Sequence, residues 1–522
     1  MTAALEETTP GWPEGVLFWP AWQIGWQTDY IARMFLMNQA LLAADLGLGK
    51  SVMGLGVAGL AMEQGEIDGV LVVCEKNKLE EWLADFGRFT RILAAIYHGP
   101  KRHKLLEGPP AALITTYETC RSDVAVFPPK RSRSRTLTDG PLMGTLRGRR
   151  LLVIYDEITK LGRRTSNLYK AHHWMLAQLR KAGPVRALGL SATPMDTDFE
   201  NVFNEMRLLV PGAMPTVREF EDRCIASRDP WGRPHYRPDG KEWFRSLVEP
   251  WILRKRKSDP DVRGSFPPLA EEFRAIRMRP DQYRVYQLLE DLAWSETGER
   301  RDVPGLATLL RQLAGDPLAV LEAGKAGNSA LAVMVADEMH DELTSCSSAK
   351  AEELIELADL VMSSGGKLLV FSFFTTVLTV LQRRLGDRTV FTYHGGQTGA
   401  VNEHQKAQFK AYQGGAILLA SDAGARGINL PEVSYVVEYE PARTFSLREQ
   451  RKGRGHRLGR LDPMTLITFV LESSVEGARA MPSMLARNAD QDYILGDEDA
   501  DGHMTADDRR ELFAQARRRK GA

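Results

Sequence analysis

The sequence predicts an α/β fold in which parallel sheets are flanked by helices. Short apolar runs typical of buried strands recur along the chain, and several of them open into polar or glycine-rich loops. The first such run leads through a glycine-rich turn into a helix-like segment. A chain of 522 residues has room for two or three domains, each with a full core.

The composition is that of an ordinary soluble globular protein, with 43% hydrophobic and 26% charged residues. Lys plus Arg (68) balances Asp plus Glu (68), so any nucleic-acid surface must come from local patches. The four cysteines are widely scattered, which argues against a disulfide framework or zinc module and fits a reducing compartment. There is no apolar leader and no run long enough to span a membrane. We therefore expect no membrane partner and a cytoplasmic location, bacterial or viral in a bacterial host, or a nuclear one if the source is eukaryotic.

A phosphate-binding loop follows the first strand-like run, residues 40–44. Gly47 and Gly49 let the backbone turn its N–H groups inward around an anion. Lys50 can reach the outer phosphates, and the Ser51 hydroxyl can coordinate Mg²⁺. The next segment, 52–62, is helix-like, so its positive end faces the phosphates. These residues predict that the chain binds ATP with Mg²⁺.

The next strands, 69–74, 112–114 and 151–155, complete the first half of the chain. The last of them ends in Asp156 and Glu157. Asp156 would hold Mg²⁺ opposite Ser51, and Glu157 would orient and deprotonate the attacking water. Taken alone, the acidic pair is also compatible with an ordinary helix start. A further strand at 187–190 is followed by Ser-Ala-Thr-Pro at 191–194.

The second half has strands at 367–371, 416–420 and 433–437 but no phosphate loop of its own, while 251–345 reads as polar and helical. A basic segment, 450–459, carries two arginines three positions apart. On a helix, Arg454 and Arg457 would share one face, and their guanidinium groups suit a γ-phosphate during its transfer. A solvated basic helix is the alternative for this segment.

The order of these motifs resembles the SWI/SNF-type DNA-dependent ATPases of helicase superfamily two. Ala44 stands at the first glycine position of the phosphate loop, a variant that is similar to motif I of that superfamily. The segments that carry the resemblance to the other motifs are, in order, 72–86, 114–118, 156–157, 190–194, 372–374, 421–430 and 450–459. Segments 201–211, 250–257 and 310–317 resemble further signatures of the family.

The resemblance implies two RecA-like lobes with helical inserts between them, and an ATP site that is complete only when the lobes close. The expected organisation is a tail (1–14), an N-terminal ATP-binding lobe (15–250), a linker and helical insert (251–345), a C-terminal helicase lobe (346–480) and an extension (481–522). Gln23 is at the right spacing from Lys50 to recognise the nucleotide, and Gly427 and Gln450 are further expected nucleotide contacts. Contacts to DNA are expected from Lys76, Thr115, Thr116, Ser372 and Ser421.

The implied track is double-stranded DNA, contacted through its backbone with little sequence preference. The implied activity is ATP-driven translocation that remodels or displaces bound protein or DNA structures; the protein partners cannot be read from the sequence. Ile158 and Thr159 replace the usual Ala-His or Gly-His after the acidic pair. The segments at 190–194 and 421–430, with their Ser-Ala-Thr and Ala-Arg-Gly sequences, resemble the corresponding motifs of RNA helicases. Three alternatives therefore remain: a helicase that anneals or unwinds forks and branches, an RNA helicase, and a nucleotide-binding scaffold with little turnover.

Overall fold

The computed structural model describes residues 17–18, 25–129, 136–195, 198–229, 232, 234–293, 303–422, 428, 430, 432–456, 462–477 and 493–495. These residues form two compact units. Unit 1 contains the described residues up to Val262 together with 493–495, and unit 2 contains those from Arg263 to 477. Across the described parts of the chain, every helix is too short or too polar to span a lipid bilayer.

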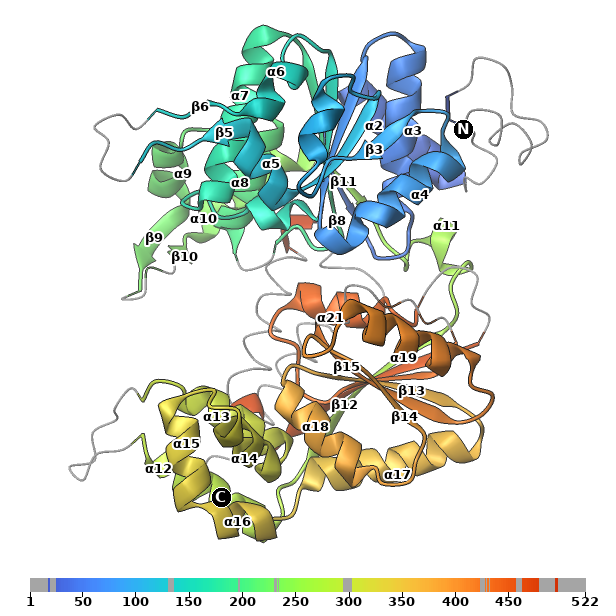
Figure 1. Cartoon of the computed structure of the whole chain (residues 1–522). Helices are drawn as coiled ribbons and strands as arrows, with labels where there is room; N and C mark the ends of the chain where they lie inside the picture. The colour runs from blue at the N-terminus through green and yellow to red at the C-terminus, as the bar shows by residue number, and fades with distance from the viewer. Residues whose placement is uncertain are drawn as a thin grey trace. The chain divides into compact units, whose positions relative to one another are not determined.

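Unit 1 is built on a seven-stranded sheet with helices on both faces (Figure 1). The strand order is β11-β1-β8-β7-β2-β4-β3, and every pairing within it is parallel. The strands are β1 (Gln39–Ala44), β2 (Gly69–Cys74), β3 (Ala94–Ile96), β4 (Ala112–Thr116), β7 (Leu151–Asp156), β8 (Val185–Ser191) and β11 (Ile252–Lys255). Because the strands are parallel, the loops at their carboxyl ends gather along one edge, where α/β sheets bind ligands.

The helices of unit 1 pack on this sheet, and two short antiparallel hairpins extend from it (Figure 1). The helices are α2 (Gly25–Met37), α3 (Lys50–Glu63), α4 (Leu79–Phe89), α5 (Tyr117–Val124), α6 (Pro141–Leu146), α7 (Asn167–Ala182), α8 (Phe199–Leu209), α9 (Val217–Cys224), α10 (Pro238–Val248) and α11 (Pro260–Arg263). The hairpins pair β5 (Ala125–Val126) with β6 (Thr138–Asp139), and β9 (Ile225–Arg228) with β10 (Pro234–Tyr236).

Three residues near the C-terminus also belong to unit 1. Ile494 and Leu495 are buried in its hydrophobic core. The ring of Tyr493 lies 6.3 Å from that of Phe199, between centroids, and the Arg245 guanidinium lies over it at 4.9 Å. The chain therefore returns to unit 1 after it has built unit 2.

Unit 2 contains a six-stranded, all-parallel sheet in the order β12-β17-β16-β13-β15-β14. Its strands are β12 (Leu269–Ile276), β13 (Lys367–Ser372), β14 (Val390–Tyr393), β15 (Ala416–Ser421), β16 (Tyr435–Glu438) and β17 (Met464–Leu471). Its helices are α12 (Pro280–Asp291), α13 (Leu306–Gly315), α14 (Pro317–Lys325), α15 (Ala330–Glu338), α16 (His340–Ser345), α17 (Ala349–Ser363), α18 (Thr375–Arg384), α19 (Gly399–Ala411) and α21 (Phe445–Lys452).

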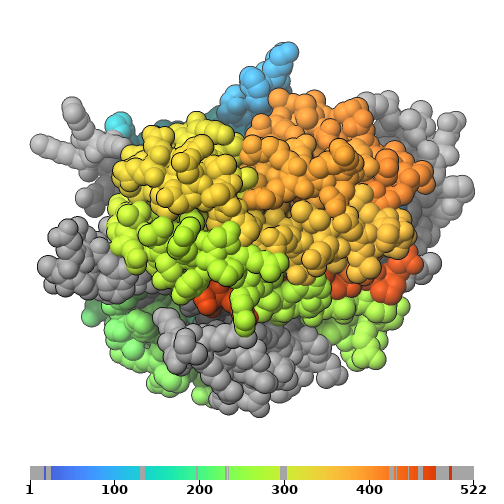
Figure 2. Space-filling view, turned by 90° about the horizontal axis from the view of Figure 1, so that it is seen from below, coloured from blue at the N-terminus to red at the C-terminus, as the bar shows by residue number. Residues whose placement is uncertain are grey.

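Helices α12 to α16 are packed against the sheet-bearing part of unit 2 rather than forming a separate core. One hydrophobic cluster joins Leu313 of α13 and Val320 of α14 to Val377 of α18 and Leu368 of β13. In the space-filling view these helices (yellow) adjoin the sheet-bearing part (orange) (Figure 2). The helical insert and the second sheet are thus one packed body.

The predicted α/β class, with parallel sheets flanked by helices, is confirmed. The structure differs within 251–345, where the sequence predicts only helix. β11 lies there and pairs with β1, and β12 lies there and pairs with β17 along its whole length. Both are edge strands. β12 is partly exposed, and the two basic residues of β11, Arg254 and Lys255, pair with Asp45 and Asp261, so both strands accommodate the polar residues that made this stretch read as helix.

Candidate functional site

The glycine-rich turn lies between β1 and α3, at the carboxyl edge of the unit 1 sheet. Gly47 and Gly49 have φ angles of 87° and 78°, in the left-handed region that favours glycine. A Cβ at Gly49 would also lie 2.6 Å from Nε2 of Gln27. Helix α3 begins at Lys50, so its first N–H groups face the turn. Backbone geometry and helix end together form a cradle for an anion.

Gln27 is a loop-supporting residue that the sequence analysis missed. It is buried in α2, and its Nε2 donates a hydrogen bond to the carbonyl of Leu48 at 2.9 Å. Its position in an amphipathic helix gave no sign of this contact, which joins residues 21 apart in the chain. Gln23, the glutamine that the motif spacing favours, lies outside the described residues.

Lys50 is buried and its side chain lies along the inside of the loop. Its Nζ donates to the carbonyl oxygens of Ala44, at 2.9 Å, and Asp45, at 3.5 Å. Burial lowers the pKa of Lys50, against the opposing effects of Glu157 and Asp156. The lysine therefore lies in the electrostatic field of both carboxylates.

Asp156 is the last residue of β7 and Glu157 follows it; β7 is separated from β1 by β8 alone. Two strand spacings put the ends of β1 and β7 roughly 10 Å apart. Asp156 is buried; its Oδ2 accepts a hydrogen bond from Nε1 of Trp82 at 2.9 Å, and its carbonyl accepts one from the Tyr117 hydroxyl at 2.9 Å. Ser191 ends β8 between them, and its hydroxyl accepts a hydrogen bond from the N–H of Thr193.

Glu157 has a left-handed backbone, with φ at 56°, a conformation that is costly for a non-glycine residue and common at functional sites. Burial raises its pKa to about 7, with Asp156 adding to the effect and Lys50 opposing it. Burial also raises the pKa of Asp156. A carboxyl group with a pKa near neutrality is suited to accept a proton at physiological pH.

The residues present fit a magnesium ion. Burial disfavours the charge of both carboxyl groups, and a divalent cation would relieve that cost. The Ser51 hydroxyl at the start of α3 and the Asp156 carboxylate are oxygen donors of the kind that Mg²⁺ prefers. Among the described residues, no group of three or more His, Cys, Asp or Glu side chains could hold a metal.

Ile158 occupies the position where the motif resemblance implies a small residue, directly after Glu157. It is fully buried, and a Cβ on Gly189 of β8 would come within 2.9 Å of its Cδ1. Close apolar packing thus joins the segment after β7 to β8 at this point.

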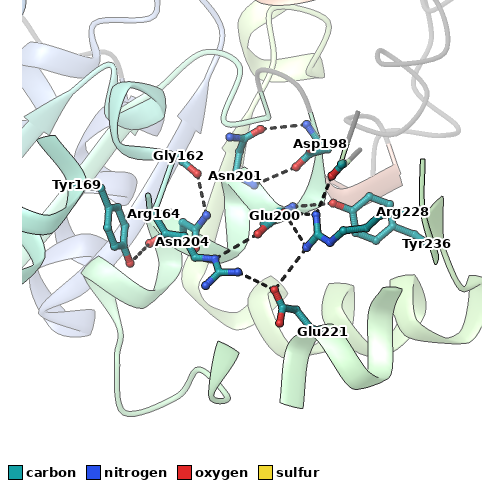
Figure 3. A network of polar contacts seen from close by, with 11 residues as sticks. Gly162, Arg164, Tyr169, Asp198, Glu200, Asn201, Asn204, Glu221, Arg228 and Tyr236 are labelled. Atoms are coloured by element: carbon teal, nitrogen blue, oxygen red, sulfur yellow. Dashed lines mark hydrogen bonds and ion pairs between the residues drawn. The ribbon is translucent and has the colours of Figure 1, made fainter. Parts of the chain in front are cut away.

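A polar network fixes the segment that follows the acidic pair (Figure 3). Asn204 of α8 donates to the carbonyl of Gly162 at 2.8 Å. Arg164 pairs with Glu200 and Glu221 at 3.3 and 2.6 Å, and Arg228 approaches the same two carboxylates at 3.4 Å. The network joins the loop after β7 to the helix that follows β8.

The predicted DNA contacts of unit 1 lie at the ends of the neighbouring strands β2 and β4. Lys76 is exposed. Thr115 is fully buried and donates to the carbonyl of Tyr97 at 2.8 Å. Thr116 is also buried and caps α5 by accepting the N–H of Thr119 at 3.1 Å. The two threonine hydroxyls therefore have structural partners, while the lysine is accessible.

In unit 2, β13 and β15 place Ser372 directly opposite Ser421 in the sheet register. Ser372 is fully buried, and its hydroxyl donates to Oε1 of Glu440 at 2.9 Å. The Ser421 hydroxyl oxygen is buried and has no hydrogen-bond partner within the described part of the chain. The two predicted contacts are thus neighbours with different surroundings.

Two of the predicted nucleotide residues of unit 2, Gln450 and Arg454, lie in α21 and just after it. The side-chain oxygen of Gln450 is buried without a hydrogen-bond partner among the described residues. Arg454 is buried, and its Nη1 donates to the carbonyl of Ile428 at 3.2 Å. Gly427 and Arg457 lie outside the described residues.

Comparison with known proteins adds an independent result. A family model described as "SNF2-related domain" matches residues 28–317, and one described as "Helicase conserved C-terminal domain" matches residues 349–459. The chain is 22% identical over 465 residues to the SWI/SNF-related matrix-associated actin-dependent regulator of chromatin subfamily A member 1 of Mus musculus, covering 84% of this chain and 40% of that protein.

The chain is also 22% identical over 498 residues to the Caenorhabditis elegans homolog of the subfamily A protein containing DEAD/H box 1, covering 84% of this chain and 47% of that protein. It therefore spans less than half the length of these curated relatives. A solved structure, the Hef helicase domain of Pyrococcus furiosus, aligns over 90% of this chain and 99% of that one, with 16% identity and a TM-score of 0.53. This likeness is one of fold.

Proposed function

The chain belongs to the SNF2-related family of helicase-like ATPases, and from that premise we propose that it is a motor that uses ATP hydrolysis to translocate along double-stranded DNA. Translocation would displace or remodel protein or DNA structures bound to the duplex. The observation that carries the proposal is that Lys50 and the Asp156–Glu157 pair lie at the carboxyl ends of β1 and β7, separated by one strand.

Nucleotide binding is assigned to the loop between β1 and α3. The N–H groups around Gly47 and Gly49 would hold the phosphates, and Lys50 would exchange the Ala44 carbonyl for phosphate oxygens. Ser51 and Asp156 would hold Mg²⁺, which neutralises phosphate charge when it is bound. Gln23 would contact the base.

Hydrolysis needs a group that takes a proton from water and groups that stabilise charge on the γ-phosphate. Glu157, with its pKa raised to about 7, would accept the proton. Arg454 and Arg457 of unit 2 would stabilise the transferred phosphoryl group, with Gln450 and Gly427 as supporting contacts. Turnover would then depend on residues from both units.

DNA would be contacted at strand ends in each unit, mostly through its phosphates and so with little sequence preference. Exposed Lys76 is accessible to such contacts. The Ser421 hydroxyl is buried and has no hydrogen-bond partner among the described residues, so it would bind a phosphate only after its surroundings open. Thr115, Thr116 and Ser372 already use their hydroxyls within the protein, so they would contribute chiefly by shaping the strand ends.

The test is the rate of ATP hydrolysis with duplex DNA, single-stranded DNA, forked DNA or RNA, using Glu157→Gln as the inactive control. Strong stimulation by plain duplex supports the translocase. Stimulation by RNA alone would show that the protein is an RNA helicase instead. A preference for forked DNA would show that it is a fork-processing enzyme. Equal basal rates throughout would indicate a nucleotide-binding scaffold.

A second measurement separates movement from strand separation. Displacement of a third strand bound to the duplex, without release of either duplex strand, is expected of a translocase. Release of single strands from the duplex would indicate unwinding instead.

A further inference from the structure

Arg451 is a buried arginine that none of the roles above uses. It lies on α21, three residues before Arg454, and is 1% exposed. Its Nε and Nη2 both donate to Oδ1 of Asp422, at 2.9 and 2.5 Å. Asp422 directly follows Ser421, the last residue of β15. An ion pair with two N–H donors therefore connects α21 to the carboxyl end of β15.

The same guanidinium also reaches β16. Nη1 of Arg451 donates to Oε1 of Glu438 at 3.2 Å and to the carbonyl of Glu440 at 3.1 Å. Glu438 is fully buried and also accepts a hydrogen bond from the Thr468 hydroxyl at 2.7 Å. Away from water such charge-assisted bonds are stiff, and the loss of one partner leaves the other charge uncompensated.

Helix α21 has a separate attachment to the sheet. Arg448 and Lys452 pair with Glu271 of the edge strand β12, at 2.6 and 3.1 Å. Arg448 also approaches Glu438, at 3.5 Å. The two pairs with Glu271 hold the helix to β12 without Arg451, so the Arg451–Asp422 pair adds a connection to one particular place, the end of β15.

We propose that Arg451 is a positioning residue that transmits DNA engagement at the end of β15 to the arginines that follow α21. The inference rests on the proposed function, because it takes Ser421 as a DNA contact and Arg454 as a γ-phosphate contact. The Ser421 hydroxyl is buried and has no hydrogen-bond partner among the described residues, and a phosphate that reached it would shift Asp422, the next residue. The ion pair passes that shift to Arg451 and then to Arg454, which lies just beyond the end of α21 and whose N–H donates to the Arg451 carbonyl at 3.2 Å.

The chemistry of the pair favours arginine over lysine. A guanidinium presents several donors in a fixed plane, so it can bind Asp422 with two N–H groups while it donates a third to Glu438. A lysine ammonium keeps the charge but not this geometry. Arg451→Lys should therefore restore only part of what Arg451→Gln removes.

The experiment compares ATP hydrolysis by the full chain with and without duplex DNA for wild type, Asp422→Asn, Arg451→Gln, Arg451→Lys and the Asp422→Asn/Arg451→Gln double variant. Each single neutral variant is expected to lower the stimulation by DNA roughly tenfold, within the range of coupling between two sites. The KM for ATP should change by less than about twofold, because the pair does not touch the nucleotide loop. The double variant should lose no more than either single one, because both remove the same link.

Arg384→Gln is the matched control. It breaks another ion pair of unit 2, between the partly buried Arg384 and the fully buried Asp316 at 2.5 Å, which joins α18 to the start of α14. It should lower the melting temperature but keep the stimulation by DNA. An equal loss of stimulation in this control would overturn the inference, since the effect would then be one of general stability.

The outcomes separate this inference from the proposed function. A wild-type protein that duplex DNA does not stimulate would contradict the proposed function. If duplex DNA stimulates the wild type, and stimulates the folded Asp422→Asn and Arg451→Gln variants to the same extent, only the role of Arg451 is overturned. Additive losses in the double variant would also overturn it, because the two side chains would then act separately.

Discussion

At the scale of single residues, the site of unit 1 is defined by side chains held in positions that are costly without a ligand. Lys50 is buried and bonded to backbone carbonyls, and Glu157 has a left-handed backbone and a raised pKa. Each of these features stores a free-energy cost that a bound, charged substrate can offset. The residues are therefore prepared to act on a ligand.

Lys50→Ala should abolish ATP hydrolysis and weaken nucleotide binding. The reason is that the loop would lose the positive charge that we propose binds the outer phosphates. Phosphate release measures the first effect, and binding of a fluorescent ATP analogue measures the second. Lys181→Ala, on the exposed end of α7, serves as a control that should behave as wild type. Normal turnover by Lys50→Ala would remove the lysine from the mechanism.

Arg457→Ala should slow hydrolysis roughly a thousandfold while leaving nucleotide binding nearly intact, because a guanidinium on the γ-phosphate acts mainly in the transition state. Single-turnover rates and the dissociation constant for ATP together distinguish the two effects. If the variant hydrolyses ATP at the normal rate, the arginine has no such role.

At the scale of elements, β11 explains how the phosphate loop is held at its base. Arg254 of β11 donates to Oδ1 of Asp45 at 2.8 Å, and the N–H of Lys257 donates to Oδ2 at 3.0 Å. The Asp45 N–H donates in turn to the carbonyl of Lys255 at 3.0 Å. The edge strand β11 thus fixes the residue that begins the loop.

Asp45→Asn should lower the free energy of unfolding of unit 1 by about 2 kcal/mol at pH 7. Burial would raise the pKa of Asp45, but Arg254 and the Lys257 N–H outweigh it and hold the pKa at about 2, below the ordinary 3.8. A lowered pKa stabilises the fold above the unfolded value, and the contribution is lost as the pH falls through the folded one. The difference from wild type should therefore shrink between pH 4 and pH 2.

Urea denaturation monitored on unit 1 between pH 7 and pH 2 measures this effect. Asp239→Asn, which changes an exposed carboxylate on α10, should have almost no effect at any pH. A difference for Asp45→Asn that stays constant down to pH 2 would contradict the assignment to this ion pair.

At the scale of the whole molecule, unit 1 is built from two stretches of the chain that are separated in sequence by unit 2. Residues 493–495 follow unit 2 in sequence but pack in the core of unit 1. The burial of apolar side chains holds residues 493–495 to the core of unit 1, where Ile494 is 3% exposed. Because Ile494 is buried among apolar side chains, a single charged substitution there should be enough to release the segment.

Ile494→Asp should detach this segment, because a buried carboxylate without a cation is strongly disfavoured. We expect cleavage of the C-terminal region by a dilute protease to become at least roughly tenfold faster, as expected when a local opening costs about 1.4 kcal/mol less. Mass spectrometry of the digests gives the rate. Ile494→Val, which keeps the apolar contact, should be cleaved nearly as slowly as wild type, and equal rates for both variants would contradict the docking.

The sequence by itself determined the fold class, most of the central strands, the glycine-rich loop and the family, but not β11, β12 or the buried strand β17. These features are local: apolar runs of strand length, glycines where φ must be positive, and motifs at fixed spacing can each be read from neighbouring residues. That is why the strands at 40–44, 69–74 and 151–155 and the turn at Gly47 and Gly49 agree with the structure.

Only the tertiary structure decided which side chains meet. The pairing of Arg451 with Asp422 joins residues 29 apart, and that of Gln27 with Leu48 joins residues 21 apart. Ser372 faces Ser421 because β13 and β15 are neighbours in register, while Thr115 and Thr116 turn their hydroxyls inward. Such contacts depend on strand order and register, which are set by burial of the whole sheet, so no local pattern carries them.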